Sequence, residues 1–258
     1  MLVDSHIHSH YSSDCRLSPN KIAQTLRNLG LCGVLTDHYD FDHTQGSFFT
    51  FDVFEFLKDP IVKGIDNLSR GIEMGLVPQL RSIHEKHVAL GEFDFFLGSL
   101  HYAYRDDELF EFTRSHGMDI VPYYKEYWLS MIDAVEDNGF IHALAHVDYP
   151  SRYIREFEGE IPLDDVEHLI RKTFKLLAQK NVSLEINTRR FAQEKAKAQW
   201  RWFLKVFKEC GGESVTFGSD AHTLETIGNH FRTAQEMAAE ARLTPVYYKN
   251  AKRCEMTE

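Results

Sequence analysis

The sequence has few cysteines, and they do not occur in pairs. The four are Cys15, Cys32, Cys210 and Cys254, and none forms a CxxC spacing with another. A disulfide framework needs paired cysteines, so reduced thiols in a cytoplasmic protein are the simplest interpretation. The sequence also lacks any run close to the ~20 apolar residues that a membrane-spanning helix needs.

Positive charge is scarce as well. Lys and Arg number 29 against 39 Asp and Glu, which gives a formal net charge of -10. This balance disfavours general binding of nucleic acids or of anionic membranes. It leaves room for a small phosphorylated substrate, because metal cations can reverse the field inside a pocket. Asp4 and His6 come too early for a basic stretch followed by an apolar one, so no signal peptide is expected.

Apolar and aromatic residues are plentiful. Of the 258 residues, 43% are hydrophobic, and 19 Phe and 11 Tyr argue against disorder. A chain of this length can bury a large core without disulfides. No low-complexity stretch, Gly/Ser linker or internal repeat interrupts it. We therefore expect a single domain over residues 1–258.

Short apolar segments alternate with segments of helical pattern along the whole chain, which indicates an α/β domain with a parallel sheet. Strands are predicted at 2–7, 32–36, 68–73, 93–100, 140–146, 182–187 and 214–217. Helices are predicted at 19–29, 78–89, 123–138, from 164 after an Asp164/Glu167 capping box, at 194–209 and at 223–241. The Phe-rich residues 39–66 look like a lid or insertion. Seven strands predict a distorted (β/α)7 barrel, and an open doubly wound sheet is the alternative.

Histidine and acidic residues cluster where the predicted strands end. The clusters are Asp4-Ser5-His6-Ile7-His8, Thr36-Asp37-His38, Gly71-Ile72-Glu73, Gly98-Ser99-Leu100-His101, Ala145-His146-Val147-Asp148 and Gly218-Ser219-Asp220-Ala221-His222. Barrels of this kind carry their chemistry at the carboxyl ends of the strands. Recurring ligands there predict a multinuclear metal site at the barrel mouth. Histidine with carboxylate suits Zn²⁺, Mn²⁺ or Fe²⁺ better than Mg²⁺ or Ca²⁺.

The spacing within two clusters suggests pairs of ligands. Residues two apart on a strand point to the same face, so His6 and His8 can bind one ion together. The same holds for Asp220 and His222 if their strand extends that far. Glu73 can bridge two ions. Two or three ions ~3.5–4 Å apart could hold a hydroxide and clamp a phosphate. The remaining histidines on expected helices or loops should be solvated: His84, His87, His116, His168 and His230.

Arginines follow two of the predicted strands. Arg152 and Arg155 come after the fifth strand, and Arg189 and Arg190 come after the sixth. Arginine at the mouth of a pocket can hold phosphate oxygens through paired hydrogen bonds. Surface ion pairs are the other interpretation of these four residues.

Taken together and in order, the motifs resemble those of the PHP (polymerase and histidinol phosphatase) family. The resemblance runs from about residue 4 to residue 223, and the chain is most similar to the stand-alone histidinol-phosphatase branch. It implies a distorted (β/α)7 barrel with a trinuclear metal centre.

The resemblance also divides the ligands among three metals. It implies that the first metal is held by His6, His8, Glu73 and Asp220. Glu73 would bridge to a second metal, held also by His101 and His146. A third would be held by His38, His222 and a residue of the loop after His8, for which Asp14 is the best match and Cys15 an alternative.

The expected activity is metal-dependent hydrolysis of L-histidinol phosphate to L-histidinol and phosphate, a step of histidine biosynthesis. Candidates for the acid and other catalytic roles are Asp40, Asp148, Asp220 and His222. One alternative is a phosphatase for another small phosphoester. Another is a 3′ exonuclease or nucleotide phosphoesterase like the polymerase-associated relatives, and a metal-stabilised scaffold is the non-enzymatic alternative. The oligomeric state is left open.

Overall fold

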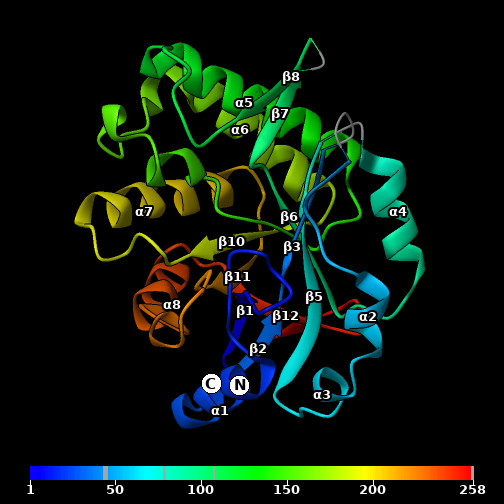
Figure 1. Ribbon diagram of the computed structural model, residues 1–258. Coiled ribbons are helices and arrows are strands. Elements are labelled where there is room, and N and C mark those ends of the chain that lie inside the picture. Colours follow the sequence, from blue (N-terminus) through cyan, green and yellow to red (C-terminus); the bar gives the residue numbers. More distant parts are fainter. Residues whose placement is uncertain (43–45, 78–79, 107, 257–258) are drawn as a thin grey trace.

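The computed structural model describes residues 1–42, 46–77, 80–106 and 108–256. Figure 1 shows its helices arranged around the outside of its strands. The strands are β1 Val3–Ile7, β2 Cys32–Leu35, β3 His38–Asp42, β4 Gly46–Phe49, β5 Leu68–Gly75, β6 Phe95–Ser99, β7 Tyr102–Arg105, β8 Glu108–Glu111, β9 Ala143–Leu144, β10 Ser183–Asn187, β11 Ser214–Gly218, β12 Thr244–Lys249 and β13 Lys252–Glu255. The helices are α1 Pro19–Leu29, α2 Val53–Lys58, α3 Pro60–Lys63, α4 Arg81–Ala89, α5 Ile120–Asp137, α6 Leu163–Gln179, α7 Glu194–Glu209 and α8 Phe231–Glu240, with 3₁₀ turns η2 Tyr149–Arg152, η3 Arg155–Phe157 and η4 Leu224–Thr226.

The predicted distorted (β/α)7 barrel is confirmed. Among the described residues, seven parallel strands neighbour one another in the order β1-β2-β5-β6-β9-β10-β11. The ring closes through a parallel bridge between Ile7 and Ala221, just past the end of β11. The His8 amide donates to the Ala221 carbonyl at 3.0 Å, and the Asp220 amide donates to the His6 carbonyl at 2.9 Å. Closure therefore brings the first and last clusters together.

The ends of α1 follow from its sequence. Pro19 begins the helix at a position where no amide hydrogen is needed, and Gly30 ends it at a φ of 69°, which a residue without a Cβ adopts easily. Ile22 and Leu26 form the buried face. The predicted capping box of α6 is wrong, because the helix begins at Leu163 after Pro162, with no side-chain cap.

Large aromatic side chains fill the layer between the barrel and its outer helices. Trp128 of α5 meets Phe174 of α6 edge to face at 6.2 Å, and Phe174 meets Phe203 of α7 in the same way at 6.2 Å. All three side chains are fully buried. Rings that interlock in this geometry stabilise beyond their buried area, so these three helices form a rigid support behind β9 and β10.

Several elements depart from the expected pattern. The stretch expected to be a lid contains β3, β4, α2 and α3, and Phe56 within it is a fully buried core residue. The hairpins β7–β8 and β12–β13 were not predicted, and β7–β8 projects away from the barrel in Figure 1. The last helix begins at Phe231, because the chain after β11 first forms an irregular loop. Within the described ranges, no helix has the length and apolar character to span a bilayer.

Candidate metal centre

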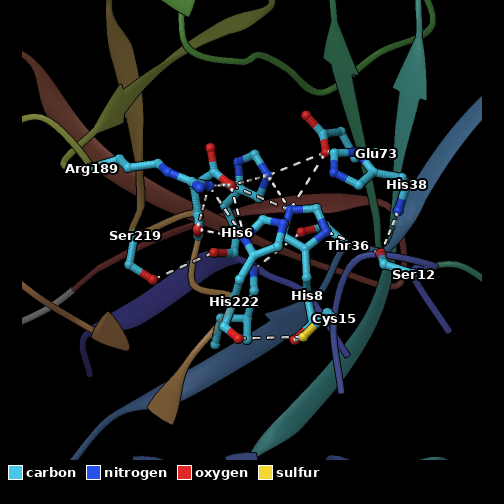
Figure 2. A network of polar contacts seen from close by, with 12 residues as sticks. His6, His8, Ser12, Cys15, Thr36, His38, Glu73, Arg189, Ser219 and His222 are labelled. Carbon is cyan, nitrogen blue, oxygen red and sulfur yellow. Dashed lines mark hydrogen bonds and ion pairs between the residues drawn. The ribbon is translucent and has the colours of Figure 1, made fainter. Parts of the chain in front are cut away.

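The predicted ligands meet at the carboxyl ends of the barrel strands. Figure 2 shows His6, His8, His38 and His222 gathered around a common centre with Glu73 beside them. Among the described residues, ligand atoms within 4.8 Å of one another define five overlapping groups. Three of them correspond to the three expected metals and are called the first, second and third group below: His6/His8/Glu73, Glu73/His101/His146 and His8/His38/His222. The other two are His6/His146/Asp220 and His38/Asp40/His101. Residues from both ends of the chain thus share one site.

The first group has the spacing of a metal ligand set. The Nε2 atoms of His6 and His8 are 3.0 Å apart. Glu73 Oε2 lies 3.4 Å and 3.6 Å from them, and Asp220 Oδ1 lies 3.8 Å and 3.4 Å from them. Four donors placed about 2.0–2.1 Å from one ion at tetrahedral angles would be about 3.3 Å apart. The four atoms match that separation.

The hydrogen bond to Glu185 determines which nitrogen of His6 can face a metal ion. Its Nδ1 lies 2.7 Å from Glu185 Oε1, so this nitrogen carries the hydrogen and donates it to the carboxylate. The Nε2 lone pair then faces His8 Nε2. His8 in turn has Nδ1 at 3.1 Å from the Ser12 hydroxyl. Two nitrogen lone pairs at close range repel unless a proton or a metal ion lies between them.

The second group is built around the other oxygen of Glu73. Oε1 lies 2.8 Å from His146 Nε2 and 3.3 Å from His101 Nε2. Asp40 accepts from His101 Nδ1 at 2.9 Å, which leaves Nε2 of that ring as the atom presented to Glu73. Glu73 is therefore placed to connect two groups of ligands, as the bridging prediction requires.

Asp14 lies beside the third group. Its Oδ2 lies 3.1 Å from His222 Nε2 and 3.6 Å from His38 Nε2. The alternative ligand, Cys15, is buried with its sulfur against the carbonyls of His8 and His222, at 3.4 Å and 3.6 Å. The carboxylate, not the thiol, is thus turned towards the two imidazoles.

The electrostatics favour a cationic occupant. Burial raises the pKa of Glu73, but His38, His6 and His101 outweigh it and hold this pKa well below its usual range. Burial also raises the pKa of Asp220, and Arg152 and His6 outweigh it in the same sense. Burial lowers the pKa of His101, whereas Asp40 and Glu73 raise it to about 9. Buried ionised carboxylates with histidines are the setting in which divalent cations replace protons.

One buried atom shows that the cluster is incomplete as a hydrogen-bonded network. Among the described residues Glu73 Oε2 has no hydrogen-bond donor, although His38 Nδ1 lies 2.8 Å away. A buried carboxylate oxygen without a donor is costly unless a cation compensates it. Imidazole and carboxylate donors without thiolate match a divalent ion of the zinc class, so the residues present fit such a metal.

A cavity of about 320 Å³ opens above these ligands. Its floor includes His38, His101, His146, Asp220 and His222. Its wall includes two of the four predicted arginines and the aromatic side chains of η2 and its neighbours. The wall includes Arg152, Arg189, Glu111, Tyr149 and Tyr153.

The arginines separate into two pairs. Arg152 donates from Nη1 to Asp220 Oδ2 at 2.5 Å, and its Nε and Nη2 have no partner among the described residues. Arg189 donates to Asp220 Oδ1 at 2.9 Å. Arg190 instead points away from the cavity and pairs with buried Asp148 at 2.8 Å. Arg155 lines a separate surface hollow. The structure brings Arg152 and Arg189, but not Arg190 and Arg155, to the site.

The four catalytic candidates differ in the same way. Asp40 and His222 line the cavity, as does Asp220, which lies between the two arginines. Asp148 does not line it, because its carboxylate is buried against Arg190. The condition for applying strand parity to Asp220 and His222 is not met, since β11 ends at Gly218 and Asp220 has a φ of 54°. The loop after the bridge, not the strand, presents both residues.

The residues that support the ligands were not predicted from the sequence: Glu185 was given no role, and Asp4 and Asp37 were included in the clusters without this role. Glu185 is fully buried and accepts from His6 and, at 2.9 Å, from the His146 amide. Asp37 accepts from Ser12, and Asp4 accepts from the Ser219 and Gly228 amides at 3.0 Å and 2.9 Å. For Asp4 and Glu185 the available signal was a charged residue inside an otherwise apolar strand, which is seldom buried without a partner.

Comparison with known proteins agrees with this geometry. Residues 4–189 match the family model of the PHP domain. The chain belongs to the PHP family. A protein of Clostridium acetobutylicum named "Probable histidinol-phosphatase" is 29% identical over 96% of this chain and 97% of its own length. The histidinol-phosphatase of Lactococcus lactis is 28% identical over 85% of this chain and 84% of its own length.

The PHP barrel also resembles a solved structure over nearly its full length. Histidinol phosphate phosphatase from Lactococcus lactis superimposes with a TM-score of 0.84 at 25% identity, covering 98% of each chain. That crystal structure contains zinc, L-histidinol and phosphate.

Proposed function

We propose that this PHP protein is a metal-dependent phosphomonoesterase that hydrolyses L-histidinol phosphate to L-histidinol and phosphate. The observation that carries the reaction class is the meeting of overlapping metal-ligand groups and two arginines in one cavity. The substrate follows from relatives that match over almost the whole chain and carry the histidinol-phosphatase name. The corresponding place in metabolism is histidine biosynthesis, in the cytoplasm.

The proposed centre holds two or three divalent ions, with zinc the first choice and manganese or iron as alternatives. His6, His8, Glu73 and Asp220 hold the first. Glu73, His101 and His146 hold the second, and His38, His222 and Asp14 hold the third. When bound, such ions neutralise phosphate oxygens and lower the pKa of a water towards ~7.

The two arginines on the cavity wall orient the phosphate. Arg152 is held by Asp220 through one nitrogen, which leaves Nε and Nη2 to donate to phosphate oxygens. A buried guanidinium fixed in this way keeps its fork geometry without reorganising. Arg189 lies on the other side of the same carboxylate and is more exposed, so it can move with the substrate.

The aromatic wall beside His101 suits the organic part of histidinol phosphate. Tyr149 packs at 4.7 Å from the ring of His101, and Tyr153 packs at 5.0 Å from Tyr149. These rings offer apolar faces for an imidazole. The Glu111 carboxylate lies on the same wall and can attract the ammonium group of an amino alcohol. A neutral sugar phosphate would leave this charge unused.

The leaving alkoxide needs a proton, and among the four candidates His222 can supply one only where the third ion is absent, because its Nε2 would otherwise bind that ion. His222 lines the cavity, and Arg189 and the Asp220 carbonyl lie 3.2 Å and 3.0 Å from its Nδ1. Asp40 and Asp220 are committed to His101 and to the arginines. Asp148 is no longer proposed, because it does not reach the cavity.

The decisive experiment combines metal analysis with a panel of phosphomonoesters. We expect chelation to abolish activity, zinc or manganese to restore it, and L-histidinol phosphate to be hydrolysed far faster than a nucleotide or a sugar phosphate. His101→Ala and Asp220→Ala variants should fold and lose metal and activity together. A folded variant that keeps both would overturn the site, and equal rates on all esters would overturn the substrate.

The same assay addresses the second candidate functions. Faster turnover of another small phosphoester would keep the metal site and change the substrate. Degradation of single-stranded DNA under Mn²⁺ would favour the exonuclease alternative, against which the net charge of -10 weighs.

A further inference from the structure

One serine hydroxyl lies at the junction of two ligand groups. Ser12 is buried, and its Oγ lies 2.8 Å from Asp37 Oδ1, 3.0 Å from the His38 amide and 3.1 Å from His8 Nδ1. Ser12 belongs to the loop after β1, and Figure 2 shows it beside His38 with a dashed line between the two residues. None of these contacts touches the cavity, so the metal and phosphate roles above leave them unexplained.

Counting hydrogens fixes the direction of each contact. Asp37 Oδ1 already accepts the amides of Ser9 and Ser12 at 2.7 Å and 3.0 Å, so it acts as an acceptor towards the Ser12 hydroxyl as well. Ser12 has a single hydrogen to donate, and Asp37 receives it. The amide of His38 donates to one lone pair of Ser12 Oγ. The remaining lone pair can only accept, so His8 Nδ1 carries the hydrogen and its Nε2 does not.

We propose that Asp37 and Ser12 form a positioning relay that sets the tautomer of His8 and joins the first ligand group to the third. The relay holds the ring of His8, which belongs to both the first and the third group. It holds the main chain of His38, which belongs to the third. Asp37 also fixes the amides of the loop that carries Asp14. The inference rests on the proposed metal site, but the tautomer is a property of the metal-free protein.

The relay explains why the third group can form from a loop. Glu185 and Asp40 act directly on His6 and His101, and each supports one imidazole. The Ser12 hydroxyl instead connects two histidines and a loop, since it accepts twice and donates once. Removing it should therefore affect the third group more than the second, which has no contact with Ser12 in the described residues.

The test uses Ser12→Ala, with Ser9→Ala as the matched control. Ser9 Oγ donates to the other oxygen of Asp37 at 2.7 Å and is not hydrogen-bonded to a histidine in the described structure. Ring nitrogen resonances of His8, assigned with a His8→Gln variant, report the tautomer without metal. Competition with a chelator reports the affinity of each ion. Loss of a group that orients a metal-binding histidine weakens the affinity roughly 10- to 100-fold.

We expect wild type and Ser9→Ala to show hydrogen on His8 Nδ1 and the same number of bound ions. Ser12→Ala should show a mixture of His8 tautomers and an affinity for the most weakly bound ion that is about 10- to 100-fold lower. Ser12→Thr should restore the tautomer and the affinity. Wild type with the hydrogen on Nε2 overturns the relay even if Ser12→Ala does not fold. Ser12→Ala with wild-type tautomer and ion affinities also overturns it. Absence of histidinol phosphate hydrolysis changes neither readout, so it refutes the proposed function alone.

Discussion

Glu185 orients the ring of His6 and the main chain of His146. Replacing it with glutamine should lower the affinity for metal while the protein stays folded. Oε1 of Glu185 accepts from His6 Nδ1 at 2.7 Å. Oε2 accepts from the His146 amide at 2.9 Å and from Asn187 Nδ2 at 3.0 Å. The carboxylate thus accepts on both sides. Glutamine keeps the shape but has one oxygen, so its amide nitrogen must face donors on one side.

The magnitude follows from which side loses its acceptor. If the amide nitrogen faces His6, the imidazole has to move its hydrogen to Nε2, and the lone pair needed for the metal is lost. If it faces His146, two donors lose their partner inside the barrel. A buried hydrogen bond to a charged group contributes about 1.5–3 kcal/mol. Since 1.4 kcal/mol is about tenfold in affinity, we expect a loss of roughly 10- to 100-fold.

The assay is competition between the protein and a chelator of known zinc affinity, together with thermal unfolding in the absence of metal. Glu160→Gln is the control, because Glu160 is exposed and pairs with Lys195 at the surface. We expect Glu185→Gln to remain folded, to bind zinc more weakly and to regain activity at high zinc. A folded Glu185→Gln variant with wild-type zinc affinity would refute the reasoning.

Three further perturbations test other parts of the structure. Arg189→Ala should raise KM for the phosphoester, and its melting temperature should stay within a few degrees of wild type. Arg190→Ala should lower the free energy of unfolding by about 3–5 kcal/mol in urea, because it leaves the buried carboxylate of Asp148 unpaired. The opposite pattern would contradict the placement of Arg189 in the cavity and of Arg190 against Asp148. Burial lowers the pKa of His84 from 6.5 to about 4, so the stability from its neutral form is complete above pH 6.5 and is lost as pH falls towards 4. That loss is about 3 kcal/mol at about 1.36 kcal/mol per pKa unit, and a His84→Leu variant should show a correspondingly flatter stability profile from pH 7 to 4. Gly218→Ala should reduce zinc binding and stability, because its Cβ would come within 2.1 Å of Glu185 Oε1; wild-type metal content there would show that the strand can shift.

The barrel strands were predictable because a parallel strand buried on both faces is a short apolar run. Val182 to Asn187 was predicted within one residue of β10, and α7 was predicted at its observed bounds. The fifth strand was overestimated, since only Ala143 and Leu144 pair as β9. The hairpins β7–β8 and β12–β13 were not predicted, because buried and exposed residues are mixed in these strands and form no continuous apolar run. His84 was expected to be solvated but is buried, since helix α4 turns it towards Asn138.

The ligand set was predictable for a reason of topology. In a barrel the carboxyl end of every strand reaches the same rim, so residues distant in sequence converge without any pairwise signal. The arginines show the limit of that argument. Arg189 and Arg190 are neighbours after the same strand, but one lines the cavity and the other is buried against Asp148. A residue that directly follows a barrel strand can be predicted to lie at the rim. Its position in the sequence does not predict whether its side chain faces the cavity.

The groups that orient the ligands lie beyond sequence reasoning, because each contact spans a different distance along the chain. His6 and Glu185 are 179 residues apart, and His101 and Asp40 are 61 apart. His6 and Glu185 come together only when the barrel closes between β1 and the loop after β11, whereas Asp40 and His101 meet because β3 and β6 both pair with β5. Asp4 secures that closure by accepting the Ser219 amide and hydroxyl. Because Ser219 precedes Asp220, opening the closure would displace a ligand of the first group while the helices behind β9 and β10 stay packed. The metal centre should therefore be lost before the fold as the protein is destabilised.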